Sequence, residues 1–389
     1  MKRNIKQEAD DKSRENKPPR KPIDKTAQAA STFNKASPPK LPPEQPIKSL
    51  QFDLFGEFVA NDKSKVSNTI EIWERIPKYF PTRSLNNLRP EKGHPDPYEW
   101  EYMEDNHKYT IVIQPALIKK NGFYKAYFPG VTEELIEEAL KKILADQNYG
   151  VHDPENAETW VKFSLSMLSR ELNARSCSRS RLEIKHAIAV MSGCIMHFYI
   201  DGEEFWKGAI LQDLVTVGRK DYLSDSDVQH TARFPIFISH AINCLDYRQF
   251  NYDRLMRCNS PLSRWVYKKL IHKFTYANYI TGNSHHFMYS DIKNSGLIQQ
   301  ARECDNRRKV KDALNELVSQ KVLSKYEVDE HRKGREVINV KYTVFATSEF
   351  VTEQKAASKR KNTIETKGID AGLKPVDKSG ISRRFNSHK

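Results

Sequence analysis

The amino-acid sequence predicts an α+β fold made of two similar halves, residues 109–250 and 251–350. In each half, apolar residues at helical spacing mark two or three helices, and two runs rich in β-branched residues follow them. The ends of the chain show neither pattern. Residues 1–48 and 351–389 are polar and rich in lysine, so they predict disordered basic tails. Residues 49–108 mix prolines with aromatic residues, which predicts a lead-in that is only partly ordered.

In the first half, a helix is expected to begin at Val131, where acidic residues occupy the first turn as the helix dipole favours. A second helix is expected over 165–173 and a third from about Ser178, each with apolar residues three and four positions apart. The apolar runs 195–200 and 210–217 then predict the two strands of a hairpin, joined through an Asp-Gly turn.

The second half repeats this order more plainly. Ser260 followed by Pro261 is typical of a helix start, with Ser as the N-cap and Pro in the first turn. After a short helix and a polar stretch, a longer helix is expected over 305–320, and strands are expected over 322–328 and 336–345. Helix, helix, turn, helix and a hairpin with a basic tip is the winged-helix order. We therefore predict two tandem winged-helix domains flanked by the basic tails.

The net charge of +14 lies mostly in the tails. Residues 1–50 carry 12 Lys/Arg against 6 Asp/Glu, and residues 351–389 carry 10 against 4. The remaining 300 residues are nearly neutral, with 42 basic and 40 acidic side chains. Basic tails add a salt-sensitive attraction to nucleic acid that is independent of base sequence. Any sequence-specific DNA binding must therefore come from local basic patches in the folded part.

One such patch lies at the start of the third helix of the first half. Basic and hydroxyl side chains gather there, although the helix dipole disfavours cations at an N-terminus. Arg recognises guanine edges in the major groove, and Ser and Lys contact phosphates. The alternative is a solvated helix end, but the mismatch with the dipole favours a recognition helix. The candidate DNA-binding residues are Arg175, Ser178, Arg179, Arg181 and Lys185.

The corresponding helix of the second half is more strongly basic, and its alternative is a charged, solvated face. Asn306 is expected to recognise adenine, and the Arg and Lys residues around it are expected to contact guanine and phosphate. The hairpin tip is a further candidate, because Gly334 makes the turn and the basic side chains beside it can reach phosphate or a minor groove. The candidates are Arg302, Asn306, Arg307, Arg308, Lys309 and Lys311 on the helix, and Arg332, Lys333 and Arg335 at the tip.

Several functional classes find no support in the sequence. It contains no run of 18 apolar residues for a transmembrane helix and no apolar N-terminal signal segment. The five scattered cysteines never form Cys-x-x-Cys, which fits a reducing cytosol. No P-loop, Gly-x-Gly-x-x-Gly motif or metal-binding carboxylate cluster is present. The sequence therefore predicts a cytoplasmic protein that is not an enzyme, has no cofactor or metal, and has no contact with a membrane.

A short motif stands where the polar tail ends. Gln51-Phe52-Asp53-Leu54-Phe55 resembles the Gln-x-[Asp/Ser/Leu]-Leu-Phe peptide by which bacterial replication proteins bind the β sliding clamp. The Gln51 amide can donate and accept hydrogen bonds, and Leu54 and Phe55 would fill a preformed apolar pocket. On a mobile tail, this peptide would reach a clamp on the same DNA at an effective concentration set by the tether. The alternative is that these five residues are the first element of the folded core.

Together these features resemble the TrfA-type plasmid replication initiators, and more loosely the RepA/RepE class of tandem winged-helix initiators. The likeness rests on the pentapeptide, on residues 161–195, and on residues 260–314 with the basic hairpin after them, and it spans roughly residues 50–347. It implies a protein that binds repeated sites (iterons) in double-stranded origin DNA, helps to melt an adjacent AT-rich region, and recruits the β clamp. It also implies the replicative helicase and a host initiator as partners, and a monomer/dimer equilibrium.

Two other interpretations remain open from the sequence. A winged-helix transcription regulator without a role in replication would carry the same basic helices, and it would bind palindromic half-sites at promoters. An enzyme that acts on DNA, such as a nuclease or a primase, would need a catalytic site, for which the sequence offers no candidate. The sequence leaves open the DNA target, the oligomeric state, and whether the origin belongs to a plasmid, an integrative element or a phage.

Overall fold

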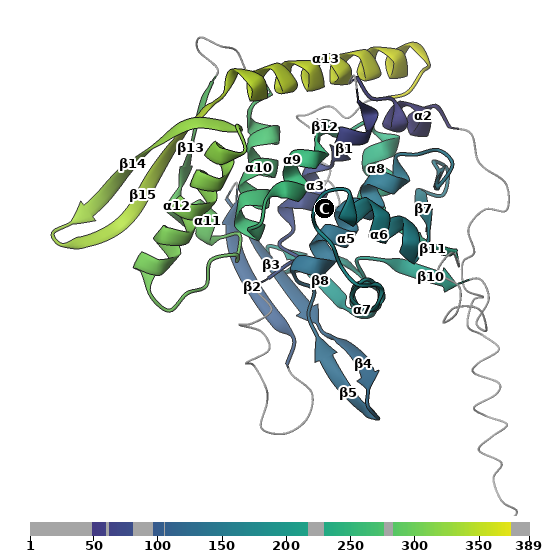
Figure 1. The fold of residues 1–389 in the computed structure, drawn as a ribbon, viewed down its shortest axis with the longest axis horizontal. Coiled ribbons are helices and arrows are strands. Elements are labelled where there is room, and N and C mark those ends of the chain that lie inside the picture. The colour runs from purple at the N-terminus through teal and green to yellow at the C-terminus, as the bar shows by residue number, and fades with distance from the viewer. Residues whose placement is uncertain are drawn as a thin grey trace, which may run out of the picture. The chain divides into compact units, whose positions relative to one another are not determined.

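The structure is a computed structural model that describes residues 49–59, 62–80, 96–104, 106–216, 229–275 and 283–374. Helices and antiparallel sheets alternate along the chain, so the fold is α+β as predicted (Figure 1). The predicted tail over 1–48 lies outside the described residues, as do residues 375–389 of the predicted C-terminal tail. None of the described helices combines the length and apolar character needed to cross a membrane.

The first half contains three helices followed by a hairpin. Its elements are β2 (Tyr98–Glu104), β3 (His107–Gln114), α5 (Val131–Leu144), α6 (Leu165–Asn173), α7 (Arg181–Gly193), β8 (Ile195–Ile200) and β9 (Glu203–Gly208). The three helices pack on one another, because each buries apolar residues three and four positions apart. The hairpin joins a sheet of order β2-β3-β8-β9, in which β3 pairs with the first hairpin strand and β2 pairs with β3.

The expected second strand of this hairpin, over 210–217, is wrong. The chain turns back at once, because Asp201 and Gly202 both take left-handed φ values, 52° and 90°, and the partner strand is therefore β9. Ile210 is fully buried. The strand after it pairs in a second sheet of order β10-β11-β7-β6. That sheet contains β6 (Gly150–Asp153), β7 (Glu158–Phe163), β10 (Gln212–Thr216) and β11 (His230–Arg233).

The second half is a winged helix. It comprises α10 (Pro261–Lys273), β13 (Ser284–Met288), α11 (Tyr289–Lys293), α12 (Glu303–Ser319), β14 (Leu323–Lys333) and β15 (Glu336–Ala346). The three strands form a sheet of order β13-β15-β14, and α12 packs against α10. The strands of the hairpin are longer than the predicted runs, since residues expected in a basic loop continue the ladder to Lys333, which lies opposite Glu336.

The two halves meet through their first helices, α5 and α10. Arg264 donates to Glu134 at 2.7 Å, and Lys268 donates to Glu138 at 2.6 Å. Each helix contributes residues four positions apart, so both ion pairs lie along one line of contact. All four side chains are buried, and a buried charge is stable only when it is paired. The described residues of both halves accordingly belong to one compact unit.

The lead-in adds a further layer of charge to this junction. Helix α3 (Glu71–Arg75) places Glu74 within 2.7 Å of Lys268 and within 2.6 Å of Lys141. Burial alone would raise the pKa of Glu74, but Lys141 and Lys268 outweigh it and hold that pKa well below its ordinary value. Trp73 beside Glu74 is fully buried. This part of the lead-in therefore packs on the folded body.

The lead-in also joins the two halves by a short ribbon. Strand β1 (Val66–Thr69) pairs with β12 (Arg248–Asn251), and helix α9 (Tyr252–Arg257) follows β12 directly. Helix α8 (Ile236–Asn243) precedes this ribbon and packs on β7. The lead-in is thus part of the scaffold that fixes the positions of α7 and α12.

The interpretation of Gln51–Phe55 as a free peptide on a mobile tail is wrong for this fold. These residues lie in helix α2 (Leu50–Gly56), where Ser49 is the N-cap. Leu54 and Phe55 are each only 2% exposed and belong to the main core. The alternative of a first core element is therefore correct. The helix forms because Phe52 and Phe55 are spaced to face the body together, which leaves Asp53 exposed on the outside.

The expected disorder from residue 351 onward is also wrong over its first part. Helix α13 (Ser348–Asp370) runs beside α2 and β12 (Figure 1). Buried Arg360 on α13 donates to the carbonyl oxygens of Leu54 and Phe55, both at 3.2 Å, and to Oδ1 of Asn68 at 2.8 Å. A guanidinium at the C-terminal end of α2 satisfies carbonyls that lack helical partners. The polar composition of α13 conceals this role, because its apolar positions are few.

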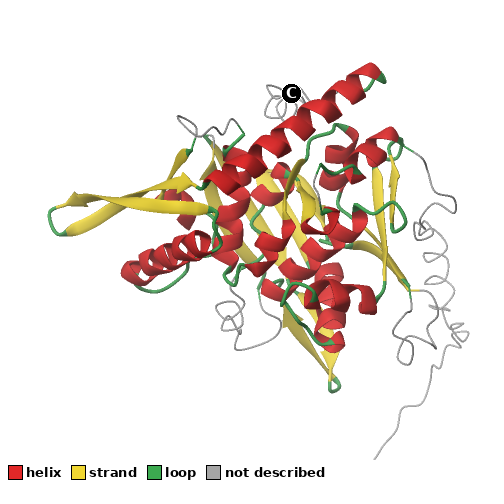
Figure 2. Cartoon of the chain, turned by 45° about the horizontal axis from the view of Figure 1, so that its top comes forward, coloured by secondary structure: helices red, strands yellow, loops and turns green. Residues whose placement is uncertain are grey.

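A second hairpin in the first half has no counterpart in the sequence expectations. It consists of β4 (Ala116–Lys120) and β5 (Phe123–Tyr127), and it projects beyond α7, as Figures 1 and 2 show. Its turn is Asn121-Gly122, and both residues have positive φ, 52° and 86°. Asn-Gly between two strands is a strong hairpin signal, so the turn itself could have revealed this element from the sequence.

Candidate DNA interface

Helix α12 presents the most open basic face among the candidates. Its apolar residues Val310, Leu314 and Leu317 are fully buried on one side. Arg308 lies on the opposite side of the helix, and Lys309 and Lys311 lie on its two flanks. All three side chains are exposed. An exposed basic stripe opposite the packed face is the arrangement by which a recognition helix enters a major groove.

The acidic residues at the start of α12 are already paired with neighbours. Glu303 accepts hydrogen bonds from Lys293 and from the hydroxyl of Tyr289 on α11. Its pKa is lowered, first by the hydrogen bond from Lys293 and then by that from Tyr289. Asp305 forms an ion pair with Arg308 at 3.0 Å, where the Arg308 side chain is 72% exposed and can exchange this partner for a phosphate. Arg302 is exposed at the N-cap.

Asn306 does not read a base in this fold. It is 2% exposed, and its side chain accepts a hydrogen bond from the Gln300 N–H at 2.8 Å and donates to the Gln300 carbonyl at 3.2 Å. The amide therefore fixes the loop that leads into α12, and it has no free edge for adenine. Arg307 is half-buried and lies close enough to Tyr289 to oppose the rise in the pKa of that hydroxyl, which burial causes. We remove Asn306 from the candidate interface and keep Arg307 at its edge.

The wing formed by β14 and β15 carries its basic groups at the extreme tip. Gly334, with φ of +63°, is the first of two turn residues, and a positive φ at that position is what a type II′ turn requires. Lys333 and Arg335 flank it and are exposed. Arg332 is also exposed but forms an ion pair with Glu330. The tip thus offers two exposed cations, and a third that would first have to leave its carboxylate.

Helix α7 starts three residues later than expected, at Arg181, with Ser180 as its N-cap. Ser180 and Glu183 form a capping box, in which each side chain bonds the backbone N–H of the other. Glu183 therefore offsets the basic residues that the helix dipole disfavours. Arg181 is exposed, as is Ser178 before the helix, while Lys185 is half-buried. The open part of α7 is consequently its first turn.

The far side of α7 is covered by the β4–β5 hairpin. The rings of Tyr127 and His186 meet edge to face with centroids 4.4 Å apart, and Cys194 donates a hydrogen bond from its Sγ to the Tyr127 carbonyl. A Cβ added to Gly193 would lie 3.0 Å from Cβ of Ala116, so the strand rests directly on the end of the helix. The hairpin therefore blocks the last turns of α7 from entering a groove.

Two of the residues proposed near α7 serve the scaffold. Arg175 is 7% exposed, forms ion pairs with Glu171 at 3.0 Å and Asp253 at 3.1 Å, and donates to the Ser64 carbonyl at 2.8 Å. Every direction of its guanidinium is occupied, so we remove Arg175 from the candidate interface. Arg179 is half-buried and donates to the Ser178 carbonyl at 2.8 Å. These bonds hold the turn ahead of α7 in place.

The β8–β9 wing of the first half has an acidic tip. Asp201, Glu203 and Glu204 are exposed there. Asp201 forms an ion pair with His107 at 2.6 Å and accepts the Lys108 N–H at 2.9 Å, and its pKa is lowered, first by the bond from His107. Carboxylates at a wing tip repel phosphate. Only the second half therefore carries a wing that suits DNA.

The arrangement offers chemistry for binding nucleic acid. Within the described ranges, no cluster of three or more His, Cys, Asp or Glu side chains is placed to hold a metal ion. Exposed cations lie on α12, at the tip of the second wing and at the start of α7. Cations on a helix and a hairpin of a winged helix bind phosphates and base edges.

Comparison with known proteins gives several structural neighbours, three of which are described here, and no relative in sequence. No family model and no curated protein matches the chain. A selenomethionine crystal structure of RctB domains 2 and 3 has a TM-score of 0.42 and 11% identity, covering 67% of this chain and 94% of its own. A second structure of these domains has a TM-score of 0.37 and 10% identity, covering 69% and 97%. The Pi initiator protein in complex with iteron DNA has a TM-score of 0.33 and 13% identity, covering 74% and 99%. At these TM-scores we draw no argument from them.

Proposed function

We propose that the chain binds duplex DNA at repeated origin sites and initiates replication there. The observation that carries this proposal is the second winged helix, in which the exposed basic face of α12 stands beside a wing with Lys333 and Arg335 at its tip. In this mode α12 enters the major groove, and the wing contacts a phosphate backbone or a minor groove. Arg308 and Lys311 are the residues best placed to reach base edges.

The first turn of α7 supplies a second, smaller contact. The α5–α10 ion pairs fix α7 and α12 within one body, so a single chain presents two different DNA-binding helices at a constant separation. Two unlike DNA-binding helices in one chain match an asymmetric DNA site. Repeats of such a site in the same direction each bind one copy, whereas a palindrome requires a symmetric dimer. This asymmetry favours direct repeats, as at an iteron origin, over the palindromes of the alternative transcription regulator.

The remaining parts of the proposal rest on the sequence resemblance to plasmid initiators. They are the melting of adjacent AT-rich DNA, recruitment of the replicative helicase and a host initiator, a monomer/dimer equilibrium, and the absence of enzymatic activity. A cytoplasmic location in a bacterium follows from the same resemblance. Each concerns a partner or a step that lies outside this single chain.

The test is footprinting of the purified full-length chain on the DNA that flanks its gene. We expect protection of short direct repeats, with one bound copy per repeat by native mass spectrometry, and loss of protection in Arg308→Gln/Lys311→Gln. Protection of a promoter palindrome by a dimer would replace initiation with transcriptional regulation. Absence of any protected duplex site, with the basic face intact, would contradict DNA recognition altogether.

Clamp docking by Gln51–Phe55 requires a change in the fold. Leu54 and Phe55 are buried, and Arg360 holds their carbonyls, so α2 must detach from the body before a clamp pocket can receive them. A substitution at Gln51 tests clamp binding without disturbing the fold, because its side chain is half-buried and does not belong to the hydrophobic core. If the peptide is used, Gln51→Ala weakens binding of the purified β clamp at unchanged thermal stability. Equal clamp binding by wild type and Gln51→Ala would remove the clamp from the proposal.

Leu54→Ala serves a different purpose in this experiment. Removing a fully buried Leu side chain costs about 2–5 kcal/mol of stability. We therefore expect Leu54→Ala to lower the melting temperature of the whole chain, whether or not a clamp is bound. A failure of replication in that variant would report lost folding rather than a lost partner.

A further inference from the structure

The tip of the β4–β5 hairpin exposes two neighbouring aromatic rings. Phe123 is 76% exposed and Tyr124 is 63% exposed, which makes them the most exposed aromatic side chains in the described part of the chain. Successive strand residues point to opposite faces, so one ring lies on each face of the hairpin. Leaving large apolar side chains in water gives up the free energy that their burial would supply. Such a pair of rings marks a site where another molecule binds.

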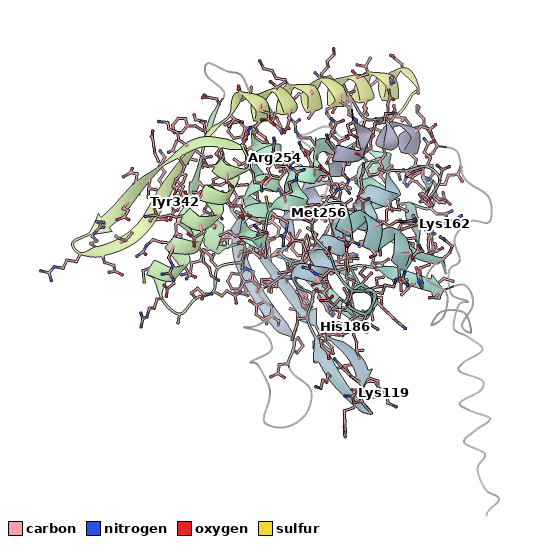
Figure 3. All side chains as sticks on the ribbon, in the orientation of Figure 1. Lys119, Lys162, His186, Arg254, Met256 and Tyr342 are labelled. Carbon is pink, nitrogen blue, oxygen red and sulfur yellow. The ribbon has the colours of Figure 1, made fainter. Side chains whose placement is uncertain are left out.

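Lysines accompany each ring. In the ladder, Lys119 lies directly opposite Tyr124, and Lys120 lies directly opposite Phe123. Lys125 follows Tyr124 on the same strand, and all three lysines are exposed. Residues 116–127 contain no Asp or Glu, so the hairpin is purely cationic. Figure 3 labels Lys119 at the far end of the projecting hairpin, away from His186 on α7.

The hairpin is held firmly at its base while its tip stands free. Ala116, Val190 and Cys194 form a small apolar cluster of their own, separate from the main core. The strands are in register from Ala116–Tyr127 out to Lys120–Phe123, and the Asn-Gly turn closes them. A rigid arm of this kind presents its rings with little loss of conformational entropy on binding.

We propose that this tip is a binding site for single-stranded DNA. Bases stack on the faces of Phe123 and Tyr124, and the lysines contact the phosphates of the same strand. The rings select single strands, because the faces of bases in a duplex are already stacked on one another, whereas an unpaired base offers its face to an aromatic side chain. The rings lie on opposite faces, so one strand passes over the tip and places a base on each side.

This site is distinct from the duplex interface and extends the proposed function. The tip of the β8–β9 wing in the same half is acidic, whereas the charged side chains of the β4–β5 hairpin are all basic. A chain that holds a duplex site with α12 while the hairpin takes one separated strand would stabilise melted DNA next to that site. The inference rests on the hairpin alone, so it can survive if the duplex proposal fails.

The test measures binding of the full-length chain to a fluorescent 20-nucleotide oligothymidine by anisotropy. We expect Phe123→Ala or Tyr124→Ala to weaken binding about tenfold, and the double variant about a hundredfold, as base–aromatic stacking predicts. Lys119→Gln/Lys120→Gln/Lys125→Gln should instead flatten the dependence of log K on log salt concentration by about 2, at roughly 0.7 per lost single-strand contact. Duplex binding should stay unchanged in all of these variants. The matched control is Ile369→Ala, which truncates a similarly exposed side chain on α13.

Three outcomes would overturn the proposal. Unchanged oligothymidine binding by the double variant would show that the rings do not stack on bases. A loss of binding to vesicles with anionic lipid, with no change for the oligonucleotide, would make the tip a membrane contact. A shift from dimer to monomer in sedimentation, again with oligonucleotide binding unchanged, would make it a contact between copies. If wild type binds the oligonucleotide through the rings but protects no duplex site, only the duplex proposal fails.

Discussion

The two winged-helix halves have similar elements but differ in what they offer to DNA. In the second half, the wing ends in Lys333, Gly334 and Arg335, and the outer face of α12 is open. In the first half, the wing ends in Asp201, Gly202 and Glu203, and the β4–β5 hairpin covers the far side of α7. Sheet pairing differs as well, since the extra strand joins the second wing strand in one half and the first wing strand in the other.

This difference shows that topology alone does not assign a DNA-binding role. Both halves present a helix where a recognition helix is expected, yet only one combines an exposed basic face with a basic wing. The first half instead serves mainly as a scaffold, because buried acidic residues of α5 bind side chains of the second half and of the lead-in. We expect the second half to supply most of the duplex affinity.

The largest effect should follow removal of the exposed cations of α12. Arg308→Gln/Lys309→Gln/Lys311→Gln should weaken duplex binding about a thousandfold, since each charge-assisted contact is worth about 1.5 kcal/mol or more. The slope of log K against log salt should fall by about 2.7, at roughly 0.9 per phosphate. The control replaces exposed lysines elsewhere, Lys162→Gln/Lys207→Gln. A thousandfold loss in that control would mean that affinity follows net charge, and the comparison of the halves would fail.

The next largest effect concerns stability at the junction between the two halves. His272 on α10 lies at 3.2 Å from Oγ1 of Thr69 and faces Glu71, Glu74, Arg248 and Lys269 from the lead-in, β12 and its own helix. Burial lowers its pKa from 6.5 to about 4, although Glu71 opposes the shift. Between pH 6.5 and 4, His272 binds a proton in the unfolded chain but stays neutral in the folded chain. The contribution of neutral His272 to the free energy of unfolding is therefore complete above pH 6.5 and is lost as pH falls toward 4.

That loss amounts to roughly 3 kcal/mol between pH 6.5 and 4. We expect His272→Asn, which keeps a polar group for Thr69, to flatten the fall of unfolding free energy over this window in urea titrations. His331→Gln on the exposed wing is the control and should leave the profile unchanged. An unaltered profile in His272→Asn would show that the junction does not exclude the proton.

Helix α7 should contribute a smaller share of duplex binding. Only its first turn is open, so Arg181→Gln/Lys185→Gln should weaken binding about tenfold, the equivalent of roughly 1.4 kcal/mol. Footprints of this variant should lose protection at one end of each repeat and keep the rest. A loss as large as that of the α12 variant would mean that the β4–β5 hairpin does not restrict α7, and the two halves would then bind DNA equally.

The second wing should rank below α7. Lys333→Gln/Arg335→Gln removes two exposed cations from a tip that contacts the DNA backbone in the proposed binding mode. Affinity should therefore fall about fivefold for specific and nonspecific duplexes alike. The salt slope should fall by about 1.8, at roughly 0.9 per lost contact. Lys325→Gln at the base of the same strand provides the control. If specificity changes while the slope stays constant, the tip reads bases rather than phosphates.

Local patterns in the sequence predicted the elements well where each element buries one regular apolar face. Helix α6 begins and ends at the predicted residues, and α12 with its hairpin lies where the apolar spacing and the basic turn indicated. The α+β class and the winged-helix order follow from these periodicities. Such features depend on residues within a few positions of one another, and a single sequence displays them directly.

The burial of several candidate residues depends on contacts with residues that are distant along the chain. A single sequence does not show which distant residues come into contact. Arg175 is occupied by Ser64 and Asp253, which lie far from it along the chain, and Leu54 and Phe55 are enclosed with the help of Arg360. The identity of a basic or apolar residue does not reveal whether its side chain is exposed or buried. The clamp motif illustrates the limit, because a pentapeptide suited to a partner's pocket is equally suited to the chain's own core.

The smallest effect tests the acidic wing directly. Glu203 is exposed beside the turn of the first wing, and Glu336 is its counterpart beside the turn of the second. Glu336→Lys should strengthen nonspecific duplex binding severalfold, because that wing contacts the DNA backbone in the proposed binding mode. Glu203→Lys changes the charge by the same amount, but in that mode it lies farther from the DNA. It should strengthen binding only about twofold at low salt, and this gain should vanish near 0.3 M, as screening over a few ångströms requires. An equal gain from both substitutions would place both wings at the DNA, and the acidic tip of the first wing would then act as a brake on binding.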